Sequence, residues 1–179
     1  MTKEEYYGKH YTHMKNVESN VVREMEALYD KVVSRIKSPE SMNKKLQGDC
    51  FEPTAENALK YESDYIGVRI ITGSLKEVYE VAAEICQRYH VVSMKDYIKK
   101  PKESGYRSMH VIIETETEDM DMPVMKVEIQ IRTATIDCWA SLEHIAKYKQ
   151  TIPMTEEIEE LLDVYYQEFM SEIEEIQMR

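Results

Sequence analysis

The sequence predicts an α+β (α/β-like) domain in which helices flank a mixed sheet of four to five strands. Residues 65–72 form a β-branched run that ends at a glycine, which is typical of a buried strand. Residues 124–131 alternate between apolar and polar side chains, so Val127 and Ile129 lie on one face and Glu128 on the other. Apolar residues at three- and four-residue steps before and after these strands indicate amphipathic helices, and interleaved helices and strands favour this class.

Three helices are predicted in the N-terminal part of the chain. The first follows an apolar stripe at 14–32 and is expected to end near Ser34. The second begins at the pair Ser38-Pro39, because serine is a common N-cap and proline a common first helical residue. The third begins at Thr54, which is also a good N-cap.

Strands and helices then alternate toward the C-terminus. The predicted strands lie, in order, at 65–72, 90–98, 106–115 and 124–131. A helix capped by Ser74 separates the first two strands, and the polar loop 99–105 separates the next two. A further helix is expected at 133–148, and an acidic helix with an apolar stripe is expected at 154–179.

The charge of the chain excludes some classes of function. The 179 residues carry a formal net charge of −11, and nine acidic residues with one basic residue at 155–179 account for −8 of it. Such a balance disfavours a protein that coats duplex nucleic acid or a membrane. The remaining body is close to neutral, at −3, and can still hold a basic pocket for an anionic ligand or a single RNA end.

The cysteines and the apolar runs point to a cytoplasmic protein. Cys50, Cys86 and Cys138 are odd in number, widely spaced and without a C-x-x-C pair, which argues against a disulfide framework and a zinc site. No apolar run approaches the ~18 residues of a membrane span. We therefore expect no signal peptide, anchor or membrane segment.

A polar face on the strand at 124–131 suggests a functional site. Glu128, Gln130 and Arg132 share this face, and a solvated sheet surface is the alternative interpretation. On the next helix, helical spacing places Glu143 beside Trp139. A half-buried carboxylate near another carboxylate favours a metal or acid–base site.

Two basic clusters are candidates for phosphate binding. The first lies at 95–107, where five bases and two acids surround Tyr106, a grouping suited to phosphates and a stacked nucleobase. The second lies at 35–45, around the start of a predicted helix whose N–H groups and dipole favour polyphosphates. Either cluster could instead be a solvated surface.

One acid stands just before the first strand. Side chains alternate along a strand, so Asp64 and Arg69 would lie on opposite faces. Either Asp64 precedes the regular strand or Gly67 marks a bulge. Taken alone, Asp64 is equally consistent with a turn residue.

Five ordered segments resemble the motifs of the RelA/SpoT-type small alarmone synthetases. They read DYIGVR at 64–69, KDYI at 95–98, KESGYRSMH at 102–110, VEIQIRT at 127–133 and WASLEH at 139–144. The resemblance implies a nucleotidyltransferase-type sheet within a single synthetase domain. That domain would comprise an N-terminal helix at 1–33, a catalytic core at 34–149 and the acidic helix at 154–179.

The resemblance also implies an activity, a cofactor and partners. Enzymes of this family are GTP pyrophosphokinases that use Mg²⁺ to move the β,γ-pyrophosphate of ATP to the 3′-hydroxyl of GDP, GTP or, in some members, GMP. The products are (p)ppGpp and AMP. A homo-oligomer is expected, with the tetramer as its form by family resemblance.

Matching the motifs assigns a role to individual residues. Asp64 and Glu128 would bind Mg²⁺, and Glu128 would also be the general base. ATP would be held by Arg35, Lys37, Ser41, Lys45 and Arg69. The acceptor nucleotide would be held by Lys95, Lys102, Tyr106, His110 and Asp137. Gln130 and Glu143 would support this shell.

The sequence departs from the family pattern at two places, and two alternatives stay open. Family members carry further bases after the position of Lys45, whereas this chain has Leu46-Gln47, which implies a weaker hold on ATP. The position of Asp137 is often asparagine, which leaves the acceptor open. The alternatives are a toxic small synthetase that modifies the 3′ end of tRNA and a catalytically weakened nucleotide-binding module.

Overall fold

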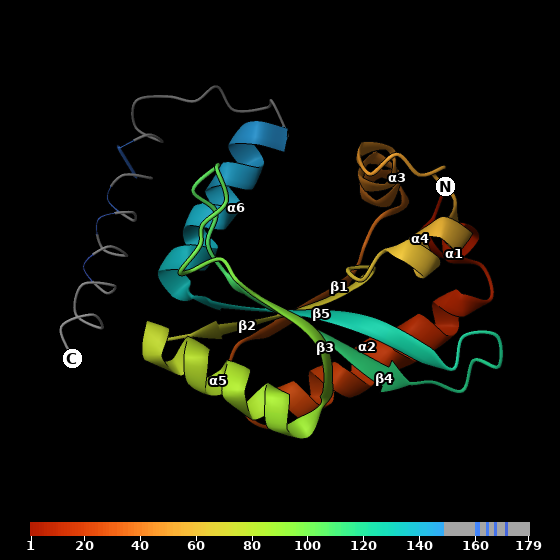
Figure 1. The fold of residues 1–179 in the computed structure, drawn as a ribbon, viewed down its shortest axis with the longest axis horizontal. Coiled ribbons are helices and arrows are strands. Elements are labelled where there is room, and N and C mark those ends of the chain that lie inside the picture. Colours follow the sequence, from red (N-terminus) through yellow and green to blue (C-terminus); the bar gives the residue numbers. More distant parts are fainter. Residues whose placement is uncertain (149–159, 162–163, 165–166, 168–170, 172–179) are drawn as a thin grey trace. The chain divides into compact units, whose positions relative to one another are not determined.

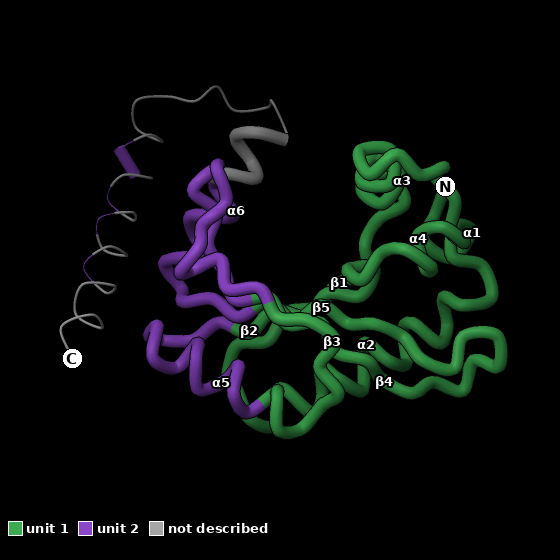
Figure 2. The backbone as a smooth tube through the Cα atoms, in the orientation of Figure 1, with its two compact units in different colours: residues 1–70, 85–94, 110–130 green, residues 71–84, 95–109, 131–179 purple. Residues whose placement is uncertain are grey.

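The computed structural model describes residues 1–148, with the backbone alone at 143–148, together with 160–161, 164, 167 and 171. The chain forms two compact units, neither of which is continuous in sequence (Figure 2). Unit 1 comprises residues 1–70, 85–94 and 110–130. Unit 2 comprises residues 71–84, 95–109 and 131–179. Each unit contains part of the predicted site.

Five strands form one sheet in the spatial order β1-β2-β5-β4-β3 (Figure 1). They are β1 (Val32–Ile36), β2 (Ile66–Thr72), β3 (His90–Asp96), β4 (Met109–Glu116) and β5 (Val124–Thr133). β1 and β2 are antiparallel. β2 and β5 run parallel, because Tyr65 contacts Lys126 where the strands begin and Thr72 contacts Arg132 where they end. The mixed five-stranded sheet confirms the predicted fold class.

Within residues 1–148, six helices accompany the sheet. They are α1 (Lys3–Tyr7), α2 (His10–Glu26), α3 (Pro39–Gly48), α4 (Ala55–Tyr61), α5 (Leu75–Arg88) and α6 (Ala134–Tyr148). The Ser38 hydroxyl accepts a hydrogen bond from the backbone of Ser41, and Pro39 is the first helical residue of α3. The Thr54 hydroxyl caps α4 in the same way. The predicted starts of both helices are confirmed, because side-chain capping is a local property of the sequence.

The predicted end of the first long helix is wrong. α2 ends at Glu26, and the residues near Ser34 form β1, which pairs with β2. Apolar spacing continues past the end of the helix through Leu28, but that side chain is 42% exposed and packs into no core. The β-branched pair Val32-Val33 starts a strand instead, because such residues fit a pleated surface better than a helix.

The core is built from one face of the helices and of the central strand. α2 buries Met14, Val17, Val21 and Met25 and packs against β1. β5 buries Met125, Val127, Ile129 and Ile131, while Glu128 and Gln130 lie half-buried on its other face. The predicted alternation of β5 is therefore confirmed, and the apolar face fixes the register that presents Glu128.

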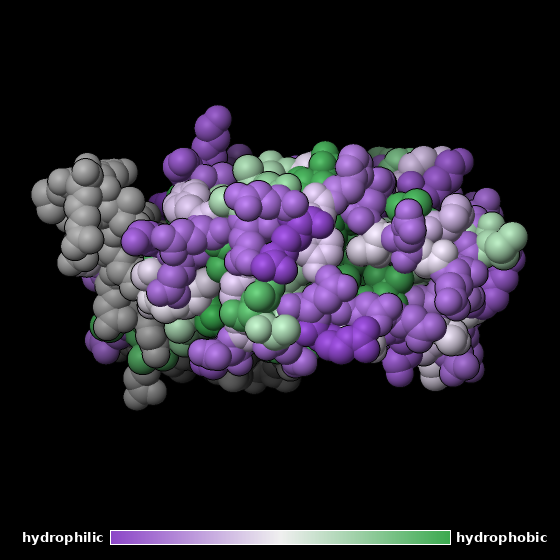
Figure 3. All heavy atoms as spheres, turned by 90° about the horizontal axis from the view of Figure 1, so that it is seen from below, coloured by the Kyte–Doolittle hydropathy of each residue, from purple (hydrophilic) through white to green (hydrophobic). Residues whose placement is uncertain are grey.

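The surface shows no large apolar region in the view of Figure 3, where hydrophilic side chains cover most of the visible face and hydrophobic ones form small groups.

In the part of the chain that the structure describes, every helix is too short or too polar to cross a lipid bilayer. Residues 160–161, 164, 167 and 171 are helical. The rest of the acidic helix predicted at 154–179 and the side chain of Glu143 lie outside the described residues.

Candidate active site

Asp64 stands two residues before β2 begins, in unit 1. Gly67 pairs directly with Arg35 in an uninterrupted antiparallel register, so there is no bulge at this point. Of the two explanations for the parity of Asp64 and Arg69, the first is therefore correct: Asp64 precedes the regular strand. Its side chain is free to turn away from the strand alternation toward the residues around α3.

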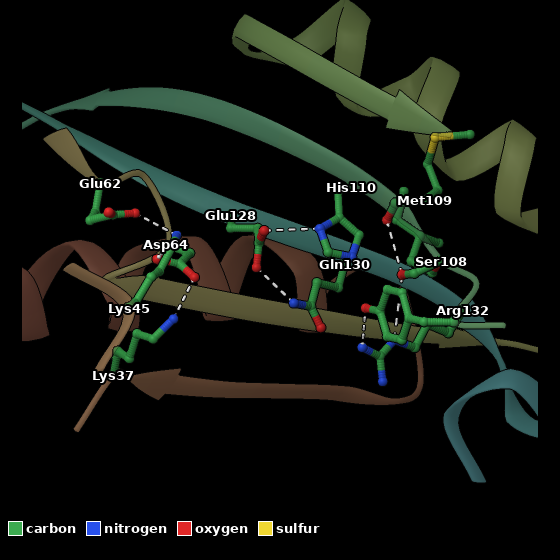
Figure 4. Close-up of polar contacts among 12 residues, drawn as sticks. Lys37, Lys45, Glu62, Asp64, Ser108, Met109, His110, Glu128, Gln130 and Arg132 are labelled. Atoms are coloured by element: carbon green, nitrogen blue, oxygen red, sulfur yellow. Dashed lines mark hydrogen bonds and ion pairs between the residues drawn. The ribbon is translucent and has the colours of Figure 1, made fainter. Parts of the chain in front are cut away.

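Two lysines converge on Asp64 (Figure 4). Lys37 Nζ lies 2.6 Å from Asp64 Oδ2, and Lys45 Nζ lies 2.9 Å from Asp64 Oδ1. Lys45 also pairs with Glu62 Oε2 at 2.5 Å, and Glu62 is only 5% exposed. The sequence analysis missed Glu62, because nothing in the linear pattern distinguishes an acid at the end of a short helix from a solvated one.

These contacts set the charge of Asp64. Burial alone would raise the pKa of the carboxyl, but the Lys37 and Lys45 ammonium groups outweigh burial and hold the pKa below its usual range. Asp64 is therefore an ionised carboxylate at neutral pH. The sequence analysis had placed both lysines with ATP and Asp64 with the metal, and the structure brings all three together.

Glu128 lies on β5, also in unit 1, and both of its oxygens are engaged (Figure 4). His110 Nδ1 on the neighbouring strand β4 lies 2.9 Å from Oε1, and Gln130 Nε2 donates to Oε2 at 2.7 Å. Burial would raise the pKa of Glu128, but the hydrogen bonds and charge of His110 and Gln130 lower it to about 2. Glu128 is thus an ionised carboxylate that His110 and Gln130 orient.

The two arginines expected to hold the adenine of ATP lie on neighbouring strands, Arg35 on the edge strand β1 and Arg69 on β2. Arg35 is exposed, and Gly67 is its direct partner on β2. Arg69 follows two residues later on the same face, as the diagonal neighbour of Arg35. A Cβ added at Gly67 would lie 3.8 Å from Arg35 Cγ, so the Arg35 side chain lies over this glycine. The exposed Ser41 lies in the first turn of α3.

Tyr106 and Lys102 form an aromatic and cationic group in unit 2. Lys102 Nζ lies 5.0 Å from the ring centroid of Tyr106 and 4.8 Å from that of Tyr97. The two rings meet at 66° with centroids 6.2 Å apart. Lys95 is exposed on β3 and makes none of these contacts. The base-plus-aromatic grouping that the sequence predicted at 95–107 is present.

Arg132 connects two residues that were assigned to the acceptor. Its side chain is only 5% exposed, Nη2 donates to the Tyr106 hydroxyl at 2.6 Å, and Nη1 pairs with Asp137 Oδ1 at 3.0 Å. Nε donates to Ser108 Oγ at 3.4 Å. The sequence analysis assigned no role to Arg132. The signal was present in strand parity, which had already separated Arg132 from the apolar face of β5.

The loop that carries Lys102 and Tyr106 is anchored at both ends. Asp96 Oδ1 accepts from the backbone N–H groups of Ile98 and Lys99, which ends β3 two residues earlier than predicted. Gly105 adopts φ +82°, and a Cβ added there would contact the Trp139 ring at 3.5 Å. The strand predicted from position 106 begins at Met109 instead, because residues 106–108 still belong to this loop.

The carboxylates can be tested for their fit to a magnesium ion. Among the described residues, no group of three or more His, Cys, Asp or Glu side chains could hold a metal by itself. Mg²⁺ commonly takes one or two carboxylates and completes its shell with water and substrate phosphates. Asp64 and Glu128 are hard oxygen donors, and each oxygen that already accepts one hydrogen bond keeps a second lone pair. They fit a Mg²⁺ ion that arrives with a nucleotide.

Comparisons with known proteins find matches to the sequence and to the fold of this chain. Residues 34–153 match the family model described as "Region found in RelA / SpoT proteins". The chain is 39% identical over 138 residues to the GTP pyrophosphokinase YwaC of Bacillus subtilis, which covers 73% of this chain and 66% of YwaC. The matched region thus spans just under two thirds of this relative, and smaller shares of the other curated relatives.

Solved structures agree with the fold over nearly the whole length. The small alarmone synthetase 2 of Bacillus subtilis aligns with a TM-score of 0.64 and 30% identity, over 97% of this chain and 95% of that one. The small alarmone synthetase 1 of the same organism, bound to its product pppGpp, aligns with a TM-score of 0.76 over 93% and 92% of the two chains. At 22% identity, the second match shows the fold alone.

Proposed function

Because this chain belongs to the RelA/SpoT family, we propose that it transfers the β,γ-pyrophosphate of ATP to the 3′-hydroxyl of GDP or GTP, which yields (p)ppGpp and AMP. The observation that carries the proposal is the ionised Glu128, oriented through both oxygens by His110 and Gln130 on the central strand of the sheet. GMP is a further acceptor under the same proposal.

The donor nucleotide would occupy the residues around α3 and β2. Lys37 and Lys45 would turn from Asp64 to the ATP phosphates, and Ser41 would donate to a phosphate oxygen at the start of α3. Arg35 and Arg69 would stack on the two faces of adenine beside Gly67. When bound, Mg²⁺ would offset the charge of the phosphate oxygens, and Asp64 and Glu128 would hold it.

The chemical step is an in-line displacement at the β-phosphorus of ATP. The 3′-oxygen of the acceptor forms a bond to this phosphorus, the bond to the α-phosphate bridging oxygen breaks, and AMP leaves with that oxygen. Glu128 accepts the proton of the 3′-hydroxyl. Its low pKa makes it a weak base, which is sufficient because a loose phosphoryl transition state requires little activation of the nucleophile. Positioning and electrostatics supply most of the rate.

The acceptor would use the residues around Arg132. Tyr106 would stack on guanine, and Asp137 would accept from the guanine N1–H and N2–H groups, a pair of donors that adenine lacks. Asp137 already accepts a hydrogen bond from Arg132, so the base would be bound by a carboxylate that Arg132 orients. Lys95, Lys102 and His110 would hold the acceptor phosphates, as implied by the family motifs.

One assay tests the proposal. Purified protein is incubated with Mg²⁺, γ-labelled ATP and, in separate reactions, GDP, GTP, GMP or tRNA. Label should move to a guanosine 3′-pyrophosphate product with release of AMP. Label that remains in ATP under all conditions would contradict the proposal, and a labelled RNA band would favour the tRNA 3′ end as acceptor.

The assembly is part of the same proposal. Family resemblance supports a homo-oligomer, and the tetramer is the form to compare with a measured mass. Light scattering coupled to size-exclusion chromatography gives that mass directly, and the mass of a single 21.1 kDa chain would contradict it.

A further inference from the structure

Helix α1 carries two neighbouring tyrosines that are almost fully buried. Tyr6 is 8% exposed and Tyr7 is 2% exposed, and their rings meet edge to face with centroids 4.9 Å apart. A capping box formed by Thr2 and Glu5 defines the start of this short helix. Both tyrosines lie outside residues 34–153, the region that matches the family. In Figure 1, α1 lies near α3, within unit 1.

Tyr7 holds the backbone of a lysine assigned to ATP. Its hydroxyl donates to the carbonyl oxygen of Lys37 at 3.1 Å. The N–H group of Lys37 donates in turn to the carbonyl oxygen of Tyr65, at 2.9 Å. Lys37 stands between the end of β1 and the start of α3, so these bonds fix a backbone that no helix or strand holds. From this position its ammonium group reaches Asp64.

Tyr6 holds the other part of the same segment. Its hydroxyl donates to Asn43 Oδ1 at 2.6 Å, and Asn43 lies on α3 between Ser41 and Lys45. Helix α1 therefore contacts the segment 37–45 at its beginning and near its end. This segment contains three of the five residues that the family motifs assign to ATP.

Loss of the Tyr6 and Tyr7 hydrogen bonds would be destabilising. Burial raises the pKa of Tyr7, so its hydroxyl stays protonated and acts as a donor. A displacement of α1 would break a part-buried hydrogen bond and leave the Tyr7 hydroxyl, on a residue only 2% exposed, without its partner. An unsatisfied buried polar group costs more free energy than the bond it made. α1 and the segment 37–45 are consequently held as one body.

We propose that Tyr6 and Tyr7 are positioning residues for the ATP-binding segment, so that the donor site extends into the N-terminal helix, outside the residues 34–153 that match the family model. This inference rests on the proposed function, because it takes the segment 37–45 to hold the ATP phosphates. The hydroxyl groups act through Lys37 and Asn43 and do not touch the nucleotide.

Removal of the hydroxyl groups alone tests the proposal. We would compare Tyr7→Phe, Tyr6→Phe and the double variant, which keep the rings and the core. The measurements are the Kd of a non-hydrolysable ATP analogue with Mg²⁺ and the KM values for ATP and GDP. Each single variant should weaken ATP binding about threefold and the double variant about tenfold, because one neutral hydrogen bond is removed each time. The KM for GDP should not change.

Tyr89→Phe is the matched control. Tyr89 donates to Glu24 elsewhere in unit 1, so this variant also loses one tyrosine hydroxyl bond but makes no contact with the segment 37–45. Amide hydrogen exchange adds a readout that is independent of activity. Amides at 37–43 should exchange faster in the double variant and at the wild-type rate in the control.

The outcomes separate the two proposals. Unchanged affinity for the ATP analogue in the double variant would overturn the positioning role, and so would an equal loss in Tyr89→Phe or an equal rise in both KM values. Wild-type protein that binds no ATP analogue would overturn the proposed function, and the positioning role with it.

Discussion

The two units organise charge in opposite ways. In unit 1, two carboxylates are surrounded by donors, with Asp64 between two lysines and Glu128 between His110 and Gln130. In unit 2, one guanidinium, that of Arg132, is surrounded by acceptors. Under the proposed function, a nucleotide with its metal would replace existing partners in unit 1, whereas the guanine base would join the cations that already contact Tyr106 in unit 2. Changes at Glu128 should then act on turnover, and changes at Tyr106 and Asp137 on the affinity of the acceptor.

Glu128→Gln should have the largest effect. The amide keeps the shape but cannot accept the 3′-hydroxyl proton or contribute a charge to the metal, so kcat should fall about a thousandfold with either acceptor. The measurement is the release of AMP under saturating substrates. Turnover within a factor of two of wild type would show that the base and metal roles are assigned wrongly. It would also remove the expected difference between an effect on turnover in unit 1 and an effect on acceptor affinity in unit 2.

Tyr106→Leu should raise the KM for GDP about thirtyfold and leave the KM for ATP near wild type, because stacking on a base contributes about 1–3 kcal/mol. Tyr106→Phe is the control, since it keeps the ring and loses only the hydrogen bond from Arg132. Steady-state kinetics with each substrate varied in turn measure both constants. An equal rise in both KM values for Tyr106→Leu would contradict the separation of donor and acceptor residues.

Asp137→Asn should have a smaller and more selective effect. The amide keeps one acceptor for the base but weakens the charge-assisted bond to Arg132, so the KM for GDP should rise about fivefold. Discrimination between GDP and inosine diphosphate should also decrease, because a carboxylate accepts from N1–H and N2–H better than an amide oxygen does. Equal preference of the wild-type protein for the two nucleotides would show that Asp137 does not contact the exocyclic amino group.

Acid should lower the free energy of unfolding through the protonation of Glu128 in unit 1. The pKa of Glu128 is lowered to about 2 in the folded protein, so the carboxylate contributes stability that is present above its ordinary pKa and is lost as the pH falls toward 2. This contribution is about 3 kcal/mol. Urea unfolding should therefore show a gap between wild type and Glu128→Gln that narrows from pH 7 to pH 3. A gap that stays constant would mean that burial offsets the His110 and Gln130 contacts.

The difference in unfolding free energy between wild type and a variant should be independent of pH when the substitution lies in unit 2. Tyr106→Phe changes no group that titrates in acid, so its difference in unfolding free energy from wild type should be equal at pH 7 and pH 3. A gap that narrows for this variant as well would indicate a general effect of acid on the fold rather than one centred on Glu128.

Local signals in the sequence predicted much of the fold. The caps at Ser38 and Thr54 and the alternation of β5 were identified because each depends on neighbouring residues alone. The end of α2 was predicted wrongly because an apolar residue at helical spacing, Leu28, continued the pattern without a core to pack against. Pairing between β1 and β2 decided that boundary, and pairing partners are not visible in a local window.

The sequence predicted roles for individual residues of the candidate site. It did not predict the hydrogen bonds and ion pairs that join these residues. Motif matching named Asp64 and Glu128, but the lysines on Asp64 and the His110 contact of Glu128 join residues from different elements. Glu62 was missed for the same reason, and Arg132 was placed on the polar face of β5 without its partners, since each acts on a named residue through a contact made only in the fold. Tyr6 and Tyr7 lie in a region without any motif, and only their hydrogen bonds reveal them.

The lysine pairs on Asp64 also bear on the response of this protein to ionic strength. Exposed lysines gather mobile anions from the solution, and a polyanion that displaces those anions binds far more weakly as salt increases. Lys37 and Lys45 already have carboxylates of the chain as their counterions. Under the proposed function, a triphosphate that binds there would exchange one fixed partner for another and displace few anions from these two lysines, so its affinity should vary little with salt concentration.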